Sequence, residues 1–213
     1  MRWKKISDAV IRRLPLYLRV LDELAADPNV QLISSQELGV RAGVGPALVR
    51  KDLAWFGEFG KQGVGYEVRF LRDELRRILN LDSEINVALV GAGSLGIALS
   101  RYNQKRRAED NSFTLNIAAL FDSDPKKIGT EIDGVMVYST EELKEKVTEL
   151  DIRMAIITVP SESAQKVADA LVEAGVKAIL NFAPVKIGVP EGVHLASADL
   201  SLELQRLAYY LRD

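Results

Sequence analysis

The chain has 213 residues, of which 47% are hydrophobic, and it contains a single His and no Cys. Such a composition provides a sizeable core, but it excludes disulfides, thiolate metal sites and cysteine nucleophiles, and one His leaves no basis for a multi-histidine metal site. No apolar run approaches the roughly 18 residues of a membrane span, and Arg12 and Arg13 interrupt the apolar stretch near the N-terminus. We therefore expect a cytoplasmic protein with no membrane segment and no metal.

Charge is distributed unevenly along the sequence. Residues 1–80 carry 14 basic and 10 acidic side chains, a net charge of +4, whereas the remainder carries 14 and 20, a net charge of −6. A basic first part and an acidic second part indicate an anionic partner for the first part only. Solvated charged helices also produce such asymmetry, so this pattern alone does not identify the partner.

The first third of the sequence predicts short helices separated by turns. Apolar residues recur at helical spacing over residues 14–25, with a proline tolerated in the first turn. Ser34 and Glu37 form a candidate capping box that opens a second helix, and Gly43 closes it. Pro46 is a favourable first residue for a third helix.

This third helix, expected from Pro46 to about Phe56, has two distinct faces on a helical wheel. Val49, Leu53 and Phe56 fall within one narrow arc that should pack on the domain. The opposite face joins two cations to two methyl-sized side chains: Ala47, Arg50, Lys51 and Ala54. Such a face suits the major groove of DNA, and two short helices joined by a turn match a helix-turn-helix. A helical hairpin with a merely charged surface remains the alternative.

The segment after this helix favours nucleic-acid binding. Glycines at 57, 60, 63 and 65 predict a small hairpin, which is where a winged helix places its wing. Lys61 and Gln62 at its tip are expected to touch phosphate or the minor groove, and Arg12 and Arg13 to hold the phosphate backbone. An amphipathic helix over about 68–79 and a linker at 80–83 complete this part.

From residue 85 the sequence alternates strands and helices, which implies βαβ units and a parallel sheet. Strands are expected at 85–90, 115–121, 154–159, 178–181 and 193–196. Helices are expected from Ser94 and at 141–147, 163–174 and 200–211. The polar stretch at 105–112 is expected to be a loop. The interpretation is an α/β chain of two domains with a boundary near residue 82.

The first strand leads into the pattern GxGxxG, at Gly91, Gly93 and Gly96, and a helix follows it. In this context the three glycines allow a tight turn, close approach of a pyrophosphate and close helix–strand packing, and the helix N-terminus attracts phosphate. Asp122 ends the next strand, where an acid accepts ribose hydroxyls and disfavours a 2′-phosphate. NAD(H) is therefore expected rather than NADP(H), although Lys126 and Lys127 lie nearby; a glycine turn without nucleotide is the alternative.

Two further strand ends fall where open α/β sheets bind ligands. They are Thr158, Val159 and Pro160 after one strand, and residues 181–184 after another. Ordinary proline-containing loops are an equally good interpretation. The single His194 lies on an expected strand and is read as a structural residue.

Several of these segments together resemble the Rex family of redox-sensing transcriptional repressors, in order along nearly the whole chain. The matching segments are Leu14–Arg19, Val49–Leu53, Phe56–Gly57, Gly60–Tyr66, Gly91–Gly96, Thr158–Pro160 and Ile179–Pro184. The resemblance implies a winged-helix domain over 1–81 (helix-turn-helix about 17–56, wing about 60–67), a Rossmann-type domain over 82–197 and a domain-swapped dimerisation helix over 198–213. Many members carry Ser or Thr where this chain has Gly45, Pro46 and Ala47, so a hydroxyl contact to phosphate is missing from the pattern.

The resemblance also implies the function and the site residues. A homodimer would bind an inverted-repeat operator when NADH is scarce and release it when NADH, preferred over NAD⁺, binds. The expected DNA contacts are Arg13, Ala47, Arg50, Lys51, Lys61, Gln62, Gly63 and Tyr66. The expected cofactor contacts are Gly91, Ala92, Gly93, Ser94, Leu95, Gly96, Asp122, Lys127, Thr158, Val159, Pro160, Asn181, Phe182, Ala183 and Pro184. A polar switch maps to Arg19, Tyr102 and Asp199.

Two other classes of protein compete with this interpretation. A nicotinamide dehydrogenase needs an acid or base near the hydride, but His194, Lys186 and Tyr209 form no recognisable constellation, so no catalytic residue is expected. A CoA-binding module also carries GxGxxG, but it leaves the winged helix unexplained.

Overall fold

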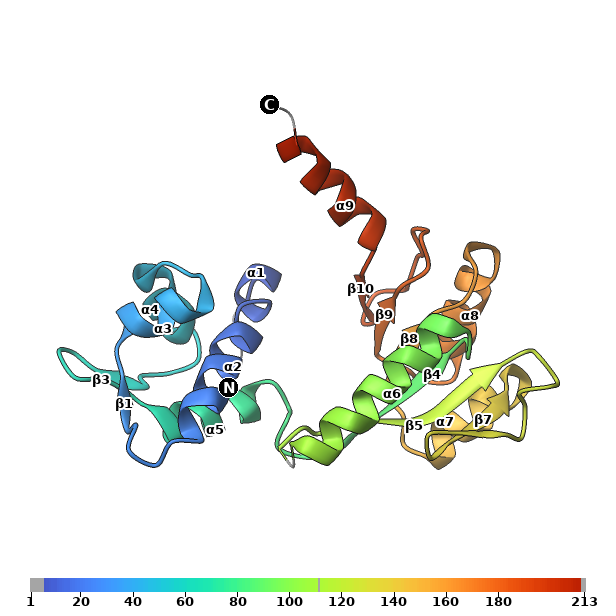
Figure 1. The fold of residues 1–213 in the computed structure, drawn as a ribbon, viewed down its shortest axis with the longest axis horizontal. Helices are drawn as coiled ribbons and strands as arrows, with labels where there is room; N and C mark the ends of the chain where they lie inside the picture. Colours follow the sequence, from blue (N-terminus) through green and yellow to red (C-terminus); the bar gives the residue numbers. More distant parts are fainter. Residues whose placement is uncertain (1–5, 111, 212–213) are drawn as a thin grey trace. The chain divides into compact units, whose positions relative to one another are not determined.

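Two units, each with its own buried core, make up the computed structural model, which describes residues 6–110 and 112–211 (Figure 1). The division falls between Ser83 and Glu84. Within the described residues, no helix combines the length and the apolar character that crossing a membrane requires.

The first unit is a helical cluster with a small antiparallel sheet. Its helices are α1 (Asp8–Ile11), α2 (Leu14–Ala25), α3 (Ser35–Ala42), α4 (Pro46–Leu53) and α5 (Val68–Ile78). Its strands are β1 (Leu32–Ile33), β2 (Gly60–Lys61) and β3 (Gly65–Glu67), in the order β1-β3-β2. The core between them includes Leu14, Tyr17, Leu21, Leu38, Val49, Leu53, Leu71 and Leu75, all of them at most 2% exposed.

Local signals place the helix ends in this unit, with two differences from the sequence predictions. Ser34 caps α3 by accepting a hydrogen bond from the Glu37 N–H at 3.0 Å, and Gly43 ends the helix with a φ of 68°. The Glu37 carboxylate pairs with Arg41, 3.0 Å away, so the expected capping box is only half formed. Helix α4 ends at Leu53, three residues before the predicted Phe56, because turns follow it.

The second unit is a parallel sheet with helices on both faces. Its strands are β4 (Ile85–Val90), β5 (Leu115–Asp122), β6 (Glu131–Ile132), β7 (Val135–Ser139), β8 (Met154–Ile157), β9 (Ala178–Asn181) and β10 (His194–Ser197). Its helices are α6 (Ser94–Glu109), α7 (Leu143–Glu149), α8 (Ser161–Glu173) and α9 (Leu200–Ala208), with short 3-10 helices η1 (Thr140–Glu142) and η2 (Tyr209–Leu211). The strand order is β10-β9-β8-β4-β5-β7-β6; every pairing is parallel except that of β6 with β7.

Strand β4 lies between two cores because alternate side chains of a strand point to opposite faces. Ala88 and Val90 belong to the cluster that contains residues of α7 and α8, whereas Val87 and Leu89 belong to the cluster against which Leu99 of α6 packs. The chain therefore winds to one side of β4 through β5 and then returns to the other side through β8. This reversal creates a switch point, where open α/β sheets bind ligands.

The structure differs from the sequence predictions at three main places in this unit. The loop expected at 105–112 is wrong over residues 105–109, because α6 continues to Glu109. The side chain of Asn103 holds this helix on the sheet: its amide donates to the Leu115 carbonyl and its oxygen accepts from the Ile117 N–H, each at 3.1 Å. The hairpin of β6 and β7 was not predicted, and β8 ends two residues before the expected Val159.

Candidate nucleic-acid interface and nucleotide pocket

Helix α4 has the two faces that the sequence predicts. Val49 is fully buried and Leu53 is 2% exposed, whereas Ala47, Arg50 and Lys51 are exposed. A side chain of the neighbouring helix α3 fixes the Arg50 guanidinium: the Arg50 Nη1 donates to the Ser35 Oγ at 2.9 Å. One face of α4 is therefore exposed and basic, while the opposite face packs in the core.

Strands β2 and β3 form the expected hairpin, with residues 62–64 at its tip. The turn is closed by a hydrogen bond from the Val64 N–H to the Lys61 carbonyl at 3.0 Å, and Gly63 takes a φ of 79° there. Lys61, Gln62 and Gly63 are exposed, whereas Tyr66 is only 8% exposed. Tyr66 thus belongs mainly to the core of the unit, which limits the DNA contact predicted for it.

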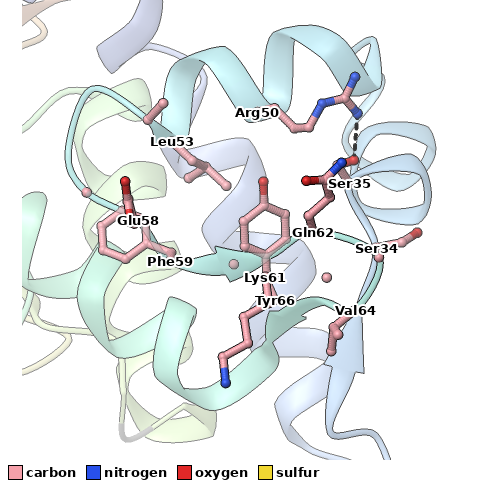
Figure 2. A pocket seen from close by; sticks show the side chains of 15 residues that line it. Ser34, Ser35, Arg50, Leu53, Glu58, Phe59, Lys61, Gln62, Val64 and Tyr66 are labelled. Carbon is pink, nitrogen blue, oxygen red and sulfur yellow. Dashed lines mark hydrogen bonds between the residues drawn. The ribbon is translucent and has the colours of Figure 1, made fainter.

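A cavity of 750 Å³ separates α4 from this hairpin (Figure 2). Arg50 and Leu53 line it on the helix side, and Lys61, Gln62 and Val64 line it on the hairpin side. Figure 2 shows the Tyr66 ring rising between them, with its hydroxyl toward α4. Figure 2 shows the Lys61 side chain extending away from α4, so the two cations stand at different places on this surface, where each can attract phosphate.

Arg13, predicted as a phosphate contact, has a different partner. Its Nε and Nη2 donate to the two Asp52 carboxylate oxygens at 2.6 and 2.8 Å, and the Tyr17 hydroxyl donates to Asp52 at 2.7 Å. Burial alone would raise the pKa of Asp52, but the hydrogen bonds from Arg13 and Tyr17 outweigh it, so the pKa lies below its usual value. The carboxylate therefore stays ionised at neutral pH.

The sequence analysis did not single out Asp52, although a signal was present. On the wheel, position 52 falls beside Val49 and Phe56, so it places a carboxylate on the apolar face of the helix. A charge on a face that must be buried requires a partner within the domain. That partner is Arg13, which was interpreted as a DNA contact.

A second cavity, of 620 Å³, lies at the carboxyl ends of β4, β5 and β8. Seven of the predicted cofactor residues line it: Gly91, Gly93, Asp122, Lys127, Thr158, Val159 and Pro160. Residues of α8 and of the η1 segment, among them Lys166 and Glu141, complete the lining and were not predicted.

The three glycines at the end of β4 have the separate roles expected of a nucleotide-binding turn. Gly91 takes a φ of 105°, and a Cβ there would lie 2.6 Å from the Thr158 carbonyl oxygen. A Cβ on Gly96 would collide with the Gly91 carbonyl oxygen. At Gly93, in contrast, a Cβ would meet no protein atom within 4 Å, so only a bound group would require a glycine there.

The first turn of α6 offers hydrogen-bond donors beside this glycine. The Ile97 N–H is the first to bond to the Gly93 carbonyl, and the N–H groups of Ser94 and Leu95 bond to no acceptor within 6–110 and 112–211. Unpaired N–H groups and the positive end of the helix dipole bind anions such as phosphate.

Asp122 is held by three donors. Its Oδ2 accepts from the Ala92 N–H at 2.8 Å and from the Lys127 Nζ at 3.0 Å, and its Oδ1 accepts from the Asp124 N–H at 2.9 Å. Burial would raise the pKa of Asp122, but these hydrogen bonds hold the pKa below its usual value. Because a carboxylate accepts about four hydrogen bonds, roughly one position is left for a ribose hydroxyl. Ala92 is fully buried: its N–H donates to the acid, its side chain packs in the apolar cluster of Val87 and Leu89, and it does not line the cavity.

Residues 181–184, expected to contact the cofactor, form a loop that the Asn181 side chain holds together. Asn181 is fully buried, and its amide donates to the carbonyls of Ala183 and Val185 at 3.1 and 3.0 Å while its oxygen accepts from the Ala183 N–H at 2.9 Å. Asn181 therefore shapes the loop, and its contact with a cofactor stays a prediction. None of residues 181–184 lines the 620 Å³ cavity, and contacts from Phe182 and Pro184 stay predictions.

The three predicted switch residues lie on separate elements. Arg19 is exposed on α2, Tyr102 is 59% exposed on α6, and Asp199 caps α9 by accepting from the Ser201 N–H at 2.8 Å. Their mutual contact stays a prediction.

Comparison with known proteins agrees with both halves of this description. Residues 5–54 match the family model described as "Putative DNA-binding protein N-terminus", and residues 82–185 match the model described as "CoA binding domain". The chain is 49% identical over 208 residues to the redox-sensing transcriptional repressor Rex of Brevibacillus brevis, covering 98% of each chain. It is 50% identical over 210 residues to Rex of Roseiflexus sp., covering 99% of this chain and 93% of that one.

Solved structures match over the same length. A crystal structure of RSP in complex with β-NAD⁺ and operator DNA superposes with a TM-score of 0.87 at 40% identity, covering 98% of this chain and 93% of that one. RSP in complex with β-NADH superposes with a TM-score of 0.82 at 38% identity, covering 98% and 95%.

A DNA-reading helix and hairpin followed by a dinucleotide-type sheet define a ligand-responsive transcription regulator. The full-length matches are more specific: the chain belongs to the Rex family of redox-sensing transcriptional repressors. The prediction of a regulator rather than an enzyme is confirmed, and the dehydrogenase interpretation is set aside. The CoA-binding model covers only the second unit, whereas the Rex relatives cover both.

Proposed function

We propose that the chain acts as a homodimer that binds an inverted-repeat operator and releases it when NADH occupies the 620 Å³ cavity. One observation carries the proposal: a single chain joins a basic reading helix and wing to a nucleotide-binding glycine turn. The two similar RSP complexes, one with β-NAD⁺ and operator DNA and the other with β-NADH, support the same assignment. A repressor acts in the compartment that holds the chromosome, which supports the expected cytoplasmic location.

A preference for NADH over NAD⁺ follows from the charge of the nicotinamide ring. An unpaired cationic ring is costly to bury in an apolar environment, so a ring enclosed by apolar side chains is bound better in its neutral, reduced form. The loop of Phe182 and Ala183 and the leucines of α9 can supply such an enclosure in the dimer. Each tenfold preference corresponds to about 1.4 kcal/mol.

Release from DNA follows from twofold geometry. Two reading helices must match half-sites about one helical turn apart, so a rotation of the protomers lowers operator affinity without any contact between NADH and DNA. By linkage, operator DNA should weaken NADH binding by the same factor that NADH weakens DNA binding.

The test is a fluorescence-anisotropy titration of an inverted-repeat duplex selected by the chain from a randomised library, with NADH and NAD⁺ compared. We expect NADH to weaken operator binding at concentrations where NAD⁺ does not. Unchanged operator affinity at saturating NADH would contradict the proposal, and equal effects of both cofactors would contradict the preference.

Arg50 and Lys61 should affect DNA binding in different ways. We expect Arg50→Ala to cost about 1–3 kcal/mol on the selected operator and to relax base preference at one position, because a guanidinium reads guanine edges. Lys61→Ala should weaken all sequences alike and lower the salt slope by about 0.9, the value for one lost phosphate contact. Affinities for operator and random duplexes over a salt series separate the two effects. Identical behaviour of both variants would show that α4 does not read sequence.

A further inference from the structure

Helix α4 carries a buried ionised side chain that DNA contact does not explain. Asp52 is 1% exposed and lies on the face of α4 opposite to the exposed face of Arg50 and Lys51. Three hydrogen-bond donors surround its carboxylate. Two of them come from one guanidinium, that of Arg13, in a bidentate pair. The third is the hydroxyl of Tyr17, which is itself fully buried.

A contribution to the stability of the fold does not account for this cluster. Desolvating a carboxylate and a guanidinium is costly, and apolar side chains of similar volume stabilise a core equally well or better. A bidentate pair supplies direction instead, because the planar fork of an arginine accepts a carboxylate in one orientation. Buried ionic groups of this kind can fix one geometry among several of similar energy.

Few other directional contacts set the orientation of α4. The helix is only eight residues long, and its N-cap, Gly45, forms no side-chain capping bond. Val49 and Leu53 hold it by apolar contact, which is non-directional and tolerates small rotations about the helix axis. Among the described residues, the side chains of α4 that form directional contacts are Arg50, bonded to Ser35, and Asp52, bonded to Arg13 and Tyr17.

A small rotation would matter for recognition. Arg50 and Lys51 immediately precede Asp52, so a rotation of the helix about its axis that displaces Asp52 also redirects both cations. Hydrogen bonds to base edges need good alignment, whereas attraction to phosphates does not. Loss of orientation should therefore reduce base discrimination more than overall affinity.

We propose that Asp52, Arg13 and Tyr17 form a positioning cluster that sets the orientation of α4 and thereby the base discrimination of Arg50 and Lys51. The three residues act without touching DNA. This inference rests on the DNA binding proposed above. It assigns Arg13 a role inside the domain in place of the phosphate contact that the sequence predicted.

The test replaces the cluster by apolar residues, in the variant Asp52→Val/Arg13→Met/Tyr17→Phe, so that no unpaired charge stays buried. Arg77→Met is the matched control, because Arg77 is a cation of the same unit, on α5, to which no DNA contact is assigned, and its side chain is 67% exposed. For each protein we would measure affinity for the operator selected by the unmodified chain, for the same duplex with one guanine position changed, and for both over a salt series. Thermal melting reports the fold.

We expect the triple variant to fold and to keep the salt slope, while its discrimination between the two duplexes falls about tenfold, within the range that one base contact supplies. The control should retain both quantities. Where the triple variant does not fold, Tyr17→Phe alone removes one of the three hydrogen bonds and should lower discrimination by a smaller factor with the same salt slope.

Two results would overturn the proposal. Discrimination equal to that of the unmodified chain in a folded variant would show that the cluster only stabilises the domain. A salt slope smaller by about 0.9 with discrimination retained would make Arg13 a phosphate contact. Failure of the unmodified chain to select any sequence would instead refute the proposed function itself.

Discussion

Replacement of Gly93 by Val is expected to abolish the response to NADH and to leave operator binding intact. The backbone at this position is extended, with φ −82° and ψ −173°, so a residue with a Cβ adopts it without strain. A Cβ there meets no protein atom within 4 Å. It would occupy the space beside the unpaired N–H groups of Ser94 and Leu95, where a pyrophosphate must approach the backbone closely.

We expect NADH affinity to fall at least about 100-fold, or roughly 2.8 kcal/mol at 1.4 kcal/mol per decade. Calorimetric titration with NADH measures the loss, and anisotropy on the selected operator shows whether DNA binding persists. An unchanged NADH affinity would place the phosphates elsewhere, and loss of both activities would indicate misfolding.

Gly96→Ala is the matched control for this experiment. The methyl group added at Gly96 is smaller than the valine side chain added at Gly93. It would nevertheless collide with the Gly91 carbonyl oxygen, which belongs to the backbone and cannot move away without a large cost in energy. This variant should therefore melt at a lower temperature than Gly93→Val. The reverse order of stability would contradict the roles assigned to the two glycines.

Local patterns in the sequence were sufficient for much of the second unit. The apolar runs at 85–90 and 178–181 have the bounds of β4 and β9 as observed. Strands buried in a parallel sheet read as mainly apolar runs, interrupted here only by Asn86 and ended by Asn181, so their positions follow from the local sequence. The glycine turn was equally predictable, because its spacing and its position between strand and helix are both local features.

The structure adds contacts that the sequence does not show where partners lie apart along the chain or within a loop. The last turns of α6 are polar and lack an apolar period, yet Asn103 holds the helix on β5, so a helix replaces the expected loop. Arg13 was expected to face DNA because nothing near it in sequence shows that Asp52, 39 residues later, takes its guanidinium. Asn181 was expected to bind cofactor, but the local loop that it stabilises uses its polar groups.

Helix α9 is expected to hold the two protomers together, since its apolar residues find no partner among the described residues of their own chain. Leu200, Leu204 and Leu207 follow the i, i+4, i+7 spacing of one helix face, and they are 68%, 63% and 51% exposed. Tyr209 and Tyr210, which follow, are each 70% exposed. Monomeric proteins rarely expose a continuous apolar face of this kind.

The double variant Leu204→Glu/Leu207→Glu should convert the dimer to a monomer. Burial of a leucine contributes about 1.5–3 kcal/mol, so four leucines across a twofold interface supply roughly 6–12 kcal/mol as an upper estimate. A loss of about 8 kcal/mol carries a dissociation constant from nanomolar to millimolar. Sedimentation equilibrium should show the mass halved, and affinity for the inverted repeat should fall to that for a single half-site. Glu203→Gln/Arg206→Gln removes an exposed ion pair from the same helix and should leave the dimer unchanged. A dimer that survives the leucine substitutions would place the interface elsewhere on the protein.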